Sequence, residues 1–74
     1  MKRTDDAVIK GVRALLRDRI NERGQEAIER GYIRADELDE LIALHMVYHE
    51  ELGGNGYLDT LMNTVKKLPI GGQN

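Results

Sequence analysis

The stretch from Asp36 to Leu52 most constrains the fold, because its apolar and acidic residues separate at helical spacing. At about 100° per residue, the two sets fall on opposite faces of one helix. We therefore expect a helix over about residues 35–52 that buries one face. Its apolar residues are Leu38, Leu41, Ile42, Tyr48 and Leu52, and its acidic residues are Asp36, Asp39, Glu40, Glu50 and Glu51.

A second helical stripe precedes this stretch. Candidate N-cap residues stand at Thr4, Asp5 and Asp6. Gly24 is a position where the helix can weaken or kink, and Gly31 is suited to cap its C-terminus. We expect this first helix over about residues 5–30. The stripe that it would bury is formed by Val8, Ile9, Val12, Leu15, Leu16 and Ile20.

A third helix is expected over about residues 57–67, after a glycine-rich turn. Pro69 would end it, and residues 70–74 would form a loose tail. We expect the turn to set the angle between the second and third helices, with a positive φ at one or more of its glycines. The turn is Gly53, Gly54, Asn55 and Gly56, and the apolar stripe of the helix is Leu58, Leu61, Met62, Val65 and Leu68.

These elements predict one all-α domain over residues 1–74, a compact three-helix domain. Short connections favour an antiparallel pair of long helices with the third helix folded across them. A chain of 74 residues buries little surface, and this one has no cysteine for disulfides. We therefore expect self-association into a homo-oligomer, with a two-fold dimer as the simplest form.

Charge is distributed unevenly along the chain. Residues 1–23 carry a net charge of +3 and residues 24–52 carry −6. A basic ridge on the first helix could meet phosphates, but the sequence has no aromatic residue on that helix and an acidic overall charge. Nucleic acid is therefore not the favoured partner, and solubility or attraction to the acidic helix explains the ridge more simply. The ridge is Arg3, Lys10, Arg13 and Arg17.

Two arginines, Arg19 and Arg23, project onto the apolar side of the first helix. Their stems can lie along apolar surface while their guanidinium groups stay in water or meet acids. We expect Asp36, Asp39 and Glu40 of a second copy to accept hydrogen bonds from them. Arg19 and Arg23 are therefore candidate interaction residues.

His45 and His49 occupy the middle of the apolar face, four residues apart, with Tyr48 beside them. Both rings could meet one metal ion, with Glu51, Asp59 or a second subunit as a third ligand. Zinc normally takes three or four protein ligands, so two histidines alone do not make a site. We expect no metal and no cofactor, and we treat His45, Tyr48 and His49 as candidate interaction residues. A metal-binding protein remains a remote alternative.

Catalysis has little support in the sequence, and we expect no enzyme. The chain has no serine and no cysteine, which removes the commonest nucleophiles. No apolar run approaches the ~20 residues of a membrane span, and no apolar segment follows the N-terminus as in a secretory signal. We expect an intracellular protein, or one assembled inside a cell.

The blocks AVIKGVRALLRDRI, RGYI, YHEELGGNGYLDTLM and KKLP resemble small uncharacterised phage and prophage proteins of Gram-positive bacteria. The resemblance runs from about Ala7 to Pro69. It implies a non-enzymatic phage accessory protein that acts by protein–protein contact, near virion assembly or the tail and lysis module. Its partner would be a phage structural protein or a host protein. The resemblance also implies a location in the cytoplasm of the bacterial host or in association with a virion. The alternative is a counter-defence protein that binds a host nuclease complex or a phosphate-bearing ligand.

Overall fold

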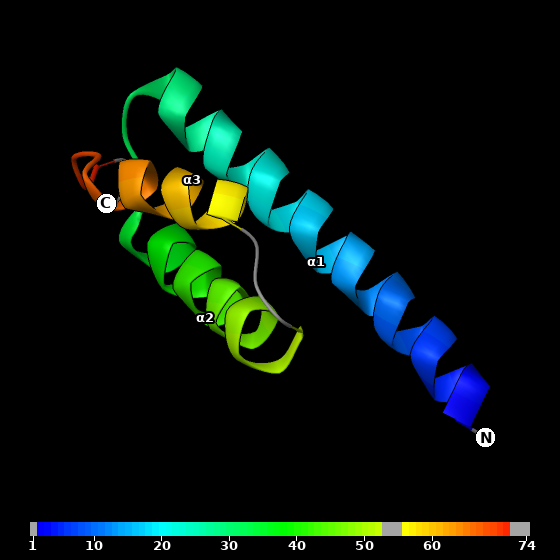
Figure 1. Ribbon diagram of the computed structural model, residues 1–74. Coiled ribbons are helices and arrows are strands. Elements are labelled where there is room, and N and C mark those ends of the chain that lie inside the picture. Colours follow the sequence, from blue (N-terminus) through cyan, green and yellow to red (C-terminus); the bar gives the residue numbers. More distant parts are fainter. Residues whose placement is uncertain (1, 53–55, 72–74) are drawn as a thin grey trace.

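A computed structural model describes residues 2–52 and 56–71, with the side chains of 2–5, 51 and 52 left aside. Three helices follow one another: α1 (Lys2–Arg30), α2 (Ala35–Leu52) and α3 (Gly56–Lys66). Each helix packs against the other two. Figure 1 shows α2 turning back below the second half of α1, with α3 lying against both. The predicted all-α three-helix fold is confirmed.

The helix bounds agree closely with the expected ones, with one correction. The second helix spans the expected residues, and the third is shifted by one residue at each end. The first helix begins three residues earlier than expected and passes through Gly24 without interruption. Gly24 therefore does not break α1, and its role has to be sought in packing.

Gly31 ends α1 in the left-handed conformation, with a φ of 89°. Its N–H donates to the carbonyl oxygens of Ala27 at 2.9 Å and Ile28 at 3.2 Å, which satisfies carbonyls at the end of the helix. The expected C-terminal glycine cap is confirmed. Glu37 supports the start of the next helix, because its Oε1 accepts the backbone N–H of Arg34 at 3.0 Å, as in one half of a capping box.

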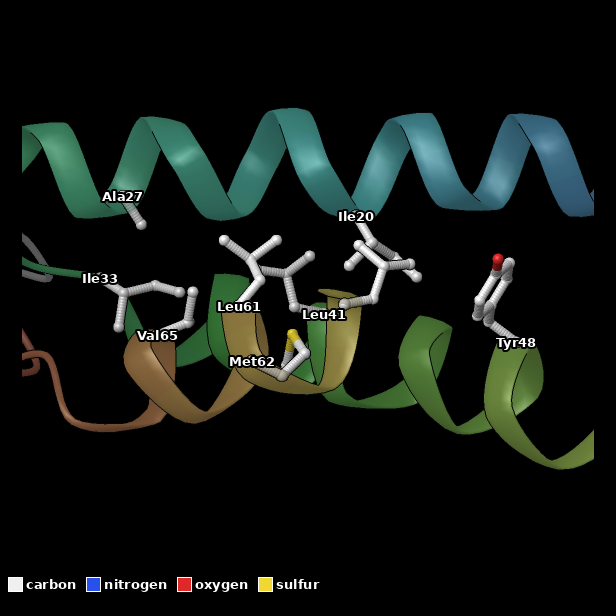
Figure 2. Packing of buried hydrophobic residues seen from close by; sticks show 9 residues of the cluster. Ile20, Ala27, Ile33, Leu41, Tyr48, Leu61, Met62 and Val65 are labelled. Carbon is white, nitrogen blue, oxygen red and sulfur yellow. The ribbon is translucent and has the colours of Figure 1, made fainter. Parts of the chain in front are cut away.

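The core lies between the second half of α1 and the paired α2 and α3, as Figure 2 shows. Apolar burial of this kind is the main force that holds a small domain together. Met62 has an unbranched side chain, whereas most of its neighbours in the core are branched, so it can fill an irregular gap. The buried residues are Ile20, Ala27, Ile33, Leu41, Tyr48, Leu58, Leu61, Met62 and Val65.

The first half of α1 extends beyond this core (Figure 1). The molecule measures 47 Å along its longest axis, against 24 and 18 Å for the others. Among the side chains of α1 that are described, from Asp6 onward, Ile20 is the first buried one, and Leu16 is partly buried against the core. The apolar stripe expected to be buried is therefore split, because an 18-residue α2 cannot accompany a 29-residue α1 over its whole length. Val8, Ile9, Val12 and Leu15 remain exposed.

The expected loose tail is corrected at its first two residues, Ile70 and Gly71, whereas residues 72–74 lie outside the described residues. Ile33 donates its N–H to the carbonyl of Pro69 at 3.0 Å, and Gly71 donates to the carbonyl of Ile33 at 3.0 Å. These bonds form a parallel bridge between Ile33 and Ile70. The segment after α3 is thereby fixed to the connection between α1 and α2, up to Gly71.

The expected turn falls mostly outside the described residues. Gly53, Gly54 and Asn55 lie there, so the prediction about their φ angles stays a prediction. Gly56 is the first residue of α3 and has no positive φ. Within residues 2–52 and 56–71, no helix is both long enough and apolar enough to cross a membrane.

Candidate functional site

The two histidines of α2 converge on a carboxylate of α3. His45 Nε2 lies 2.8 Å from Asp59 Oδ1, and His49 Nε2 lies 3.7 Å from Asp59 Oδ2. The imidazole rings stand edge to face, with their centroids 5.8 Å apart. The i, i+4 spacing on α2 puts both rings beside α3, where Asp59 accepts the ring N–H of His45.

The three residues differ in how much water they meet. The His45 side chain is 15% exposed, whereas the side chains of Asp59 and His49 are 42% and 54% exposed. His45 is therefore a partly buried polar group that needs its hydrogen bond. His49 adds only a long contact at the rim, which resembles an exposed ion pair of small energetic value.

A shallow pocket of about 310 Å³ opens beside this cluster, between α2 and α3. The wall combines both signs of charge with two thioethers, and it has no nucleophile of the serine or cysteine type. The lining residues are His45, Met46, His49, Glu50, Asp59, Met62, Asn63 and Lys66.

The metal reading of the histidine pair gains no support from this geometry. In the part of the chain that the structure describes, no group of three or more histidine, cysteine, aspartate or glutamate side chains is arranged to hold a metal ion. The short distance between His45 and Asp59 is that of a direct hydrogen bond. We conclude that the cluster of His45, His49 and Asp59 holds α2 against α3.

Tyr48 is not an interaction residue, contrary to the sequence-based expectation. It is 2% exposed and belongs to the core, where its ring points toward α1 (Figure 2). The reason is its position on α2, seven residues after the buried Leu41 and so on the same face. Of the other two candidate interaction residues on α2, His49 is exposed and His45 is partly exposed.

Arg19 and Arg23 meet an acid of the predicted helix, but within the same chain. Glu40 lies 3.8 Å from Nη2 of Arg19 and 3.9 Å from Nη1 of Arg23. The side chains of all three residues are between 38% and 51% exposed, so these ion pairs contribute little stability. The acid expected from a second copy is therefore supplied by α2 of the same copy. These arginines alone do not require a partner.

The basic ridge remains a solvated helix side. Lys10, Arg13 and Arg17 are exposed, and the side chain of Arg3 lies outside the description. Arg17 Nε lies 3.4 Å from Oδ1 of its neighbour Asp18, which offsets part of the positive charge. The ridge is therefore an ordinary charged surface, as the sequence indicated.

The sequence pattern did not predict that apolar residues of α1 would form an exposed surface. Val8 is 57% exposed, Ile9 43%, Val12 42% and Leu15 71%. We call these four residues the aliphatic face. The sequence placed them in the core because apolar periodicity alone does not tell which neighbour covers a helix. The available signal was length, since the expected first helix was about eight residues longer than the second.

The chain was compared with protein-family models, curated proteins and solved structures, and none of them matches it.

Proposed function

We propose that this protein is a non-enzymatic phage or prophage accessory protein that works by protein–protein contact through the aliphatic face of α1. The single observation that carries the proposal is the exposure of Val8, Ile9, Val12 and Leu15 on a helix that extends past its own core. The phage setting rests on the resemblance of the sequence blocks alone.

A helix of this kind is costly to leave in water. Helices shorter than about 12–15 residues are marginal without tertiary packing, and Val8, Ile9 and Val12 are β-branched residues of modest helix propensity. From Asp6 to Leu15 only Ala14 is even partly buried. Contiguous exposed apolar patches on soluble proteins commonly mark interaction sites. Contact with another protein would cover the face and stabilise this part of α1.

Site-specific photo-crosslinking in infected or induced cells tests the proposal. A photoreactive phenylalanine analogue replaces Leu15 on the aliphatic face, and in a matched variant it replaces Lys10, which is exposed on the basic side. We expect adducts from position 15 and few from position 10. Equal adducts from the two positions, or none from position 15, would contradict a contact through this face.

The mass of the adduct identifies the kind of partner. A second copy of the chain, a phage structural protein and a host protein are the three expected classes. A host nuclease complex at position 15 would favour the counter-defence role over a role in virion assembly or lysis. Each of these outcomes uses the same surface.

A further inference from the structure

We infer that the occupant of the aliphatic face is a second copy of this chain, with the first halves of two α1 helices packed antiparallel about a two-fold axis near Val12. The inference rests on the proposed function, because it names the partner of the same surface. It differs from the dimer expected from sequence, in which Arg19 and Arg23 reached acids on the second helix of the other copy.

The spacing along α1 fits helix–helix pairing. Val8, Val12 and Leu15 follow one another at intervals of four and three residues, which is the alternation of a coiled-coil seam. The same alternation continues to Asp5 at one end and to Arg19 at the other. The seam is therefore apolar in its middle and oppositely charged at its two ends.

An antiparallel two-fold arrangement makes this pattern self-complementary. With the axis at Val12, each Val12 lies beside the partner's Val12, and Val8 lies beside the partner's Leu15. The same register brings position 5, an aspartate in the sequence, level with position 19 of the partner, an arginine, because each position is seven residues from Val12. Opposite charges then meet at both ends of the seam, whereas a parallel pair would bring like charges together. The guanidinium of Arg19 is free to respond, since its side chain is 51% exposed and its contact to Glu40 is long.

The second helix extends the surface that receives the partner. Glu40 of α2 faces Arg19 and Arg23, so the residues at i+4 and i+7 from Glu40 lie on the side of α2 next to these arginines. These are Leu44, which is partly buried, and Val47, which is 47% exposed. The contact nevertheless stays small, because the seam from Asp5 to Arg19 spans only ~22 Å of helix. We therefore expect a reversible dimer rather than an obligate one.

Sedimentation equilibrium over a range of protein concentrations tests the dimer. We expect the mass of the wild-type protein to rise from 8.4 kDa toward twice that value. Val12→Glu places two carboxylates next to each other at the axis and should hold the protein at monomer mass. Lys10→Glu, on the basic side, should leave the association unchanged. A wild-type protein that remains monomeric at several hundred micromolar overturns the inference.

A charge-exchange cycle tests the register. Asp5→Arg alone and Arg19→Asp alone each bring like charges together and should weaken association several-fold. The double variant restores opposite charges with their signs reversed, and it should recover most of the lost affinity. Thermal melts followed by circular dichroism check that each variant keeps its fold. Association that the double variant does not recover would contradict the antiparallel register.

The two proposals fail in different ways. A monomeric wild-type protein that still forms adducts from position 15 with another protein overturns the dimer and keeps the contact function. Loss of position-specific adducts altogether overturns both.

Discussion

Gly24 of α1 and Leu61 of α3 are in such close contact that a Cβ atom on residue 24 would lie 2.9 Å from Cδ2 and 3.1 Å from Cγ of Leu61. Val65 Cγ2 would be 3.4 Å away. Leu61 and Val65 are both buried, so neither can move aside into water. Gly24 therefore allows α3 to approach the backbone of α1 at the centre of the core.

The first prediction concerns this contact. Gly24→Ala should destabilise the protein by about 1–2 kcal/mol, because overpacking outweighs the gain in helix propensity. Gly11→Ala is the matched control, since a Cβ there meets no atom within 4 Å. The control should be neutral or stabilising by up to about 1 kcal/mol. Thermal or urea unfolding measures both, and a stabilised Gly24→Ala variant would show that α3 does not press against α1.

The second prediction is that α3 is integral to the fold. Leu61 is 5% exposed between α1 and α3, so Leu61→Ala should cost about 2–5 kcal/mol. In the double variant Gly24→Ala with Leu61→Ala, the new methyl group enters space that the leucine has left. The double variant should therefore be more stable than the sum of the two single changes indicates. An unchanged melting temperature for Leu61→Ala would make α3 a loose appendage.

The third prediction concerns acid stability. The hydrogen bond from the backbone N–H of Arg34 lowers the pKa of Glu37 below its usual value of 4.5, and the guanidinium of Arg30, 2.7 Å away, lowers it further against the opposing effect of burial. A carboxyl with a lowered folded-state pKa stabilises the fold fully above its unfolded pKa. That contribution is lost as the pH falls from about 4.5 through the folded-state value.

Glu37→Gln should flatten this part of the acid side of the stability profile, because the amide does not titrate. Glu29→Gln, at an exposed position of α1, is the control for removing a carboxylate elsewhere. Melting temperatures between pH 7 and pH 3 measure the difference. If Glu37→Gln and wild type lose stability in parallel below pH 5, the hydrogen-bonded carboxylate is not the cause.

The fourth prediction separates the two histidines. Asp59→Ala removes the hydrogen-bond partner of the partly buried His45 and should cost about 1–3 kcal/mol. His49→Ala removes an exposed ring with only a long contact and should stay within about 0.5 kcal/mol of wild type. Equal losses in the two variants would mean that the cluster acts as one unit. Unfolding measured with and without a chelator would expose any metal contribution.

Local patterns were sufficient to predict much of this fold. Helical spacing, Gly31 and Pro69 gave the three helices nearly to the residue, because these signals act within a few turns of chain. Contacts between distant residues were not predictable in the same way. From the sequence, Gly24 was interpreted as a weak point in the first helix. Its contact with Leu61 was not predictable, because Leu61 lies 37 positions away in the sequence.

In the candidate site too, local spacing was predictable and contacts between distant residues were not. The convergence of His45 and His49 on one side of α2 followed from their spacing, whereas the approach of Asp59 depends on how α3 folds back. Glu40 was correctly named as an acid for Arg19 and Arg23, and the structure places it beside them within the same chain, whereas we had expected it from a second copy. The exposure of Val8 and Leu15 depends on where α2 ends relative to α1, which periodicity does not specify.

The central claim is that the aliphatic face of α1 is a contact surface between two copies of the chain, and methyl NMR on dilution tests it most directly. In isotope-labelled protein, we expect the methyl signals of Val8, Ile9, Val12 and Leu15 to shift between millimolar and low micromolar concentration. The methyl signals of the buried Leu58 and Val65 should stay in place. Signals on the aliphatic face that do not move over this range would contradict self-association through α1.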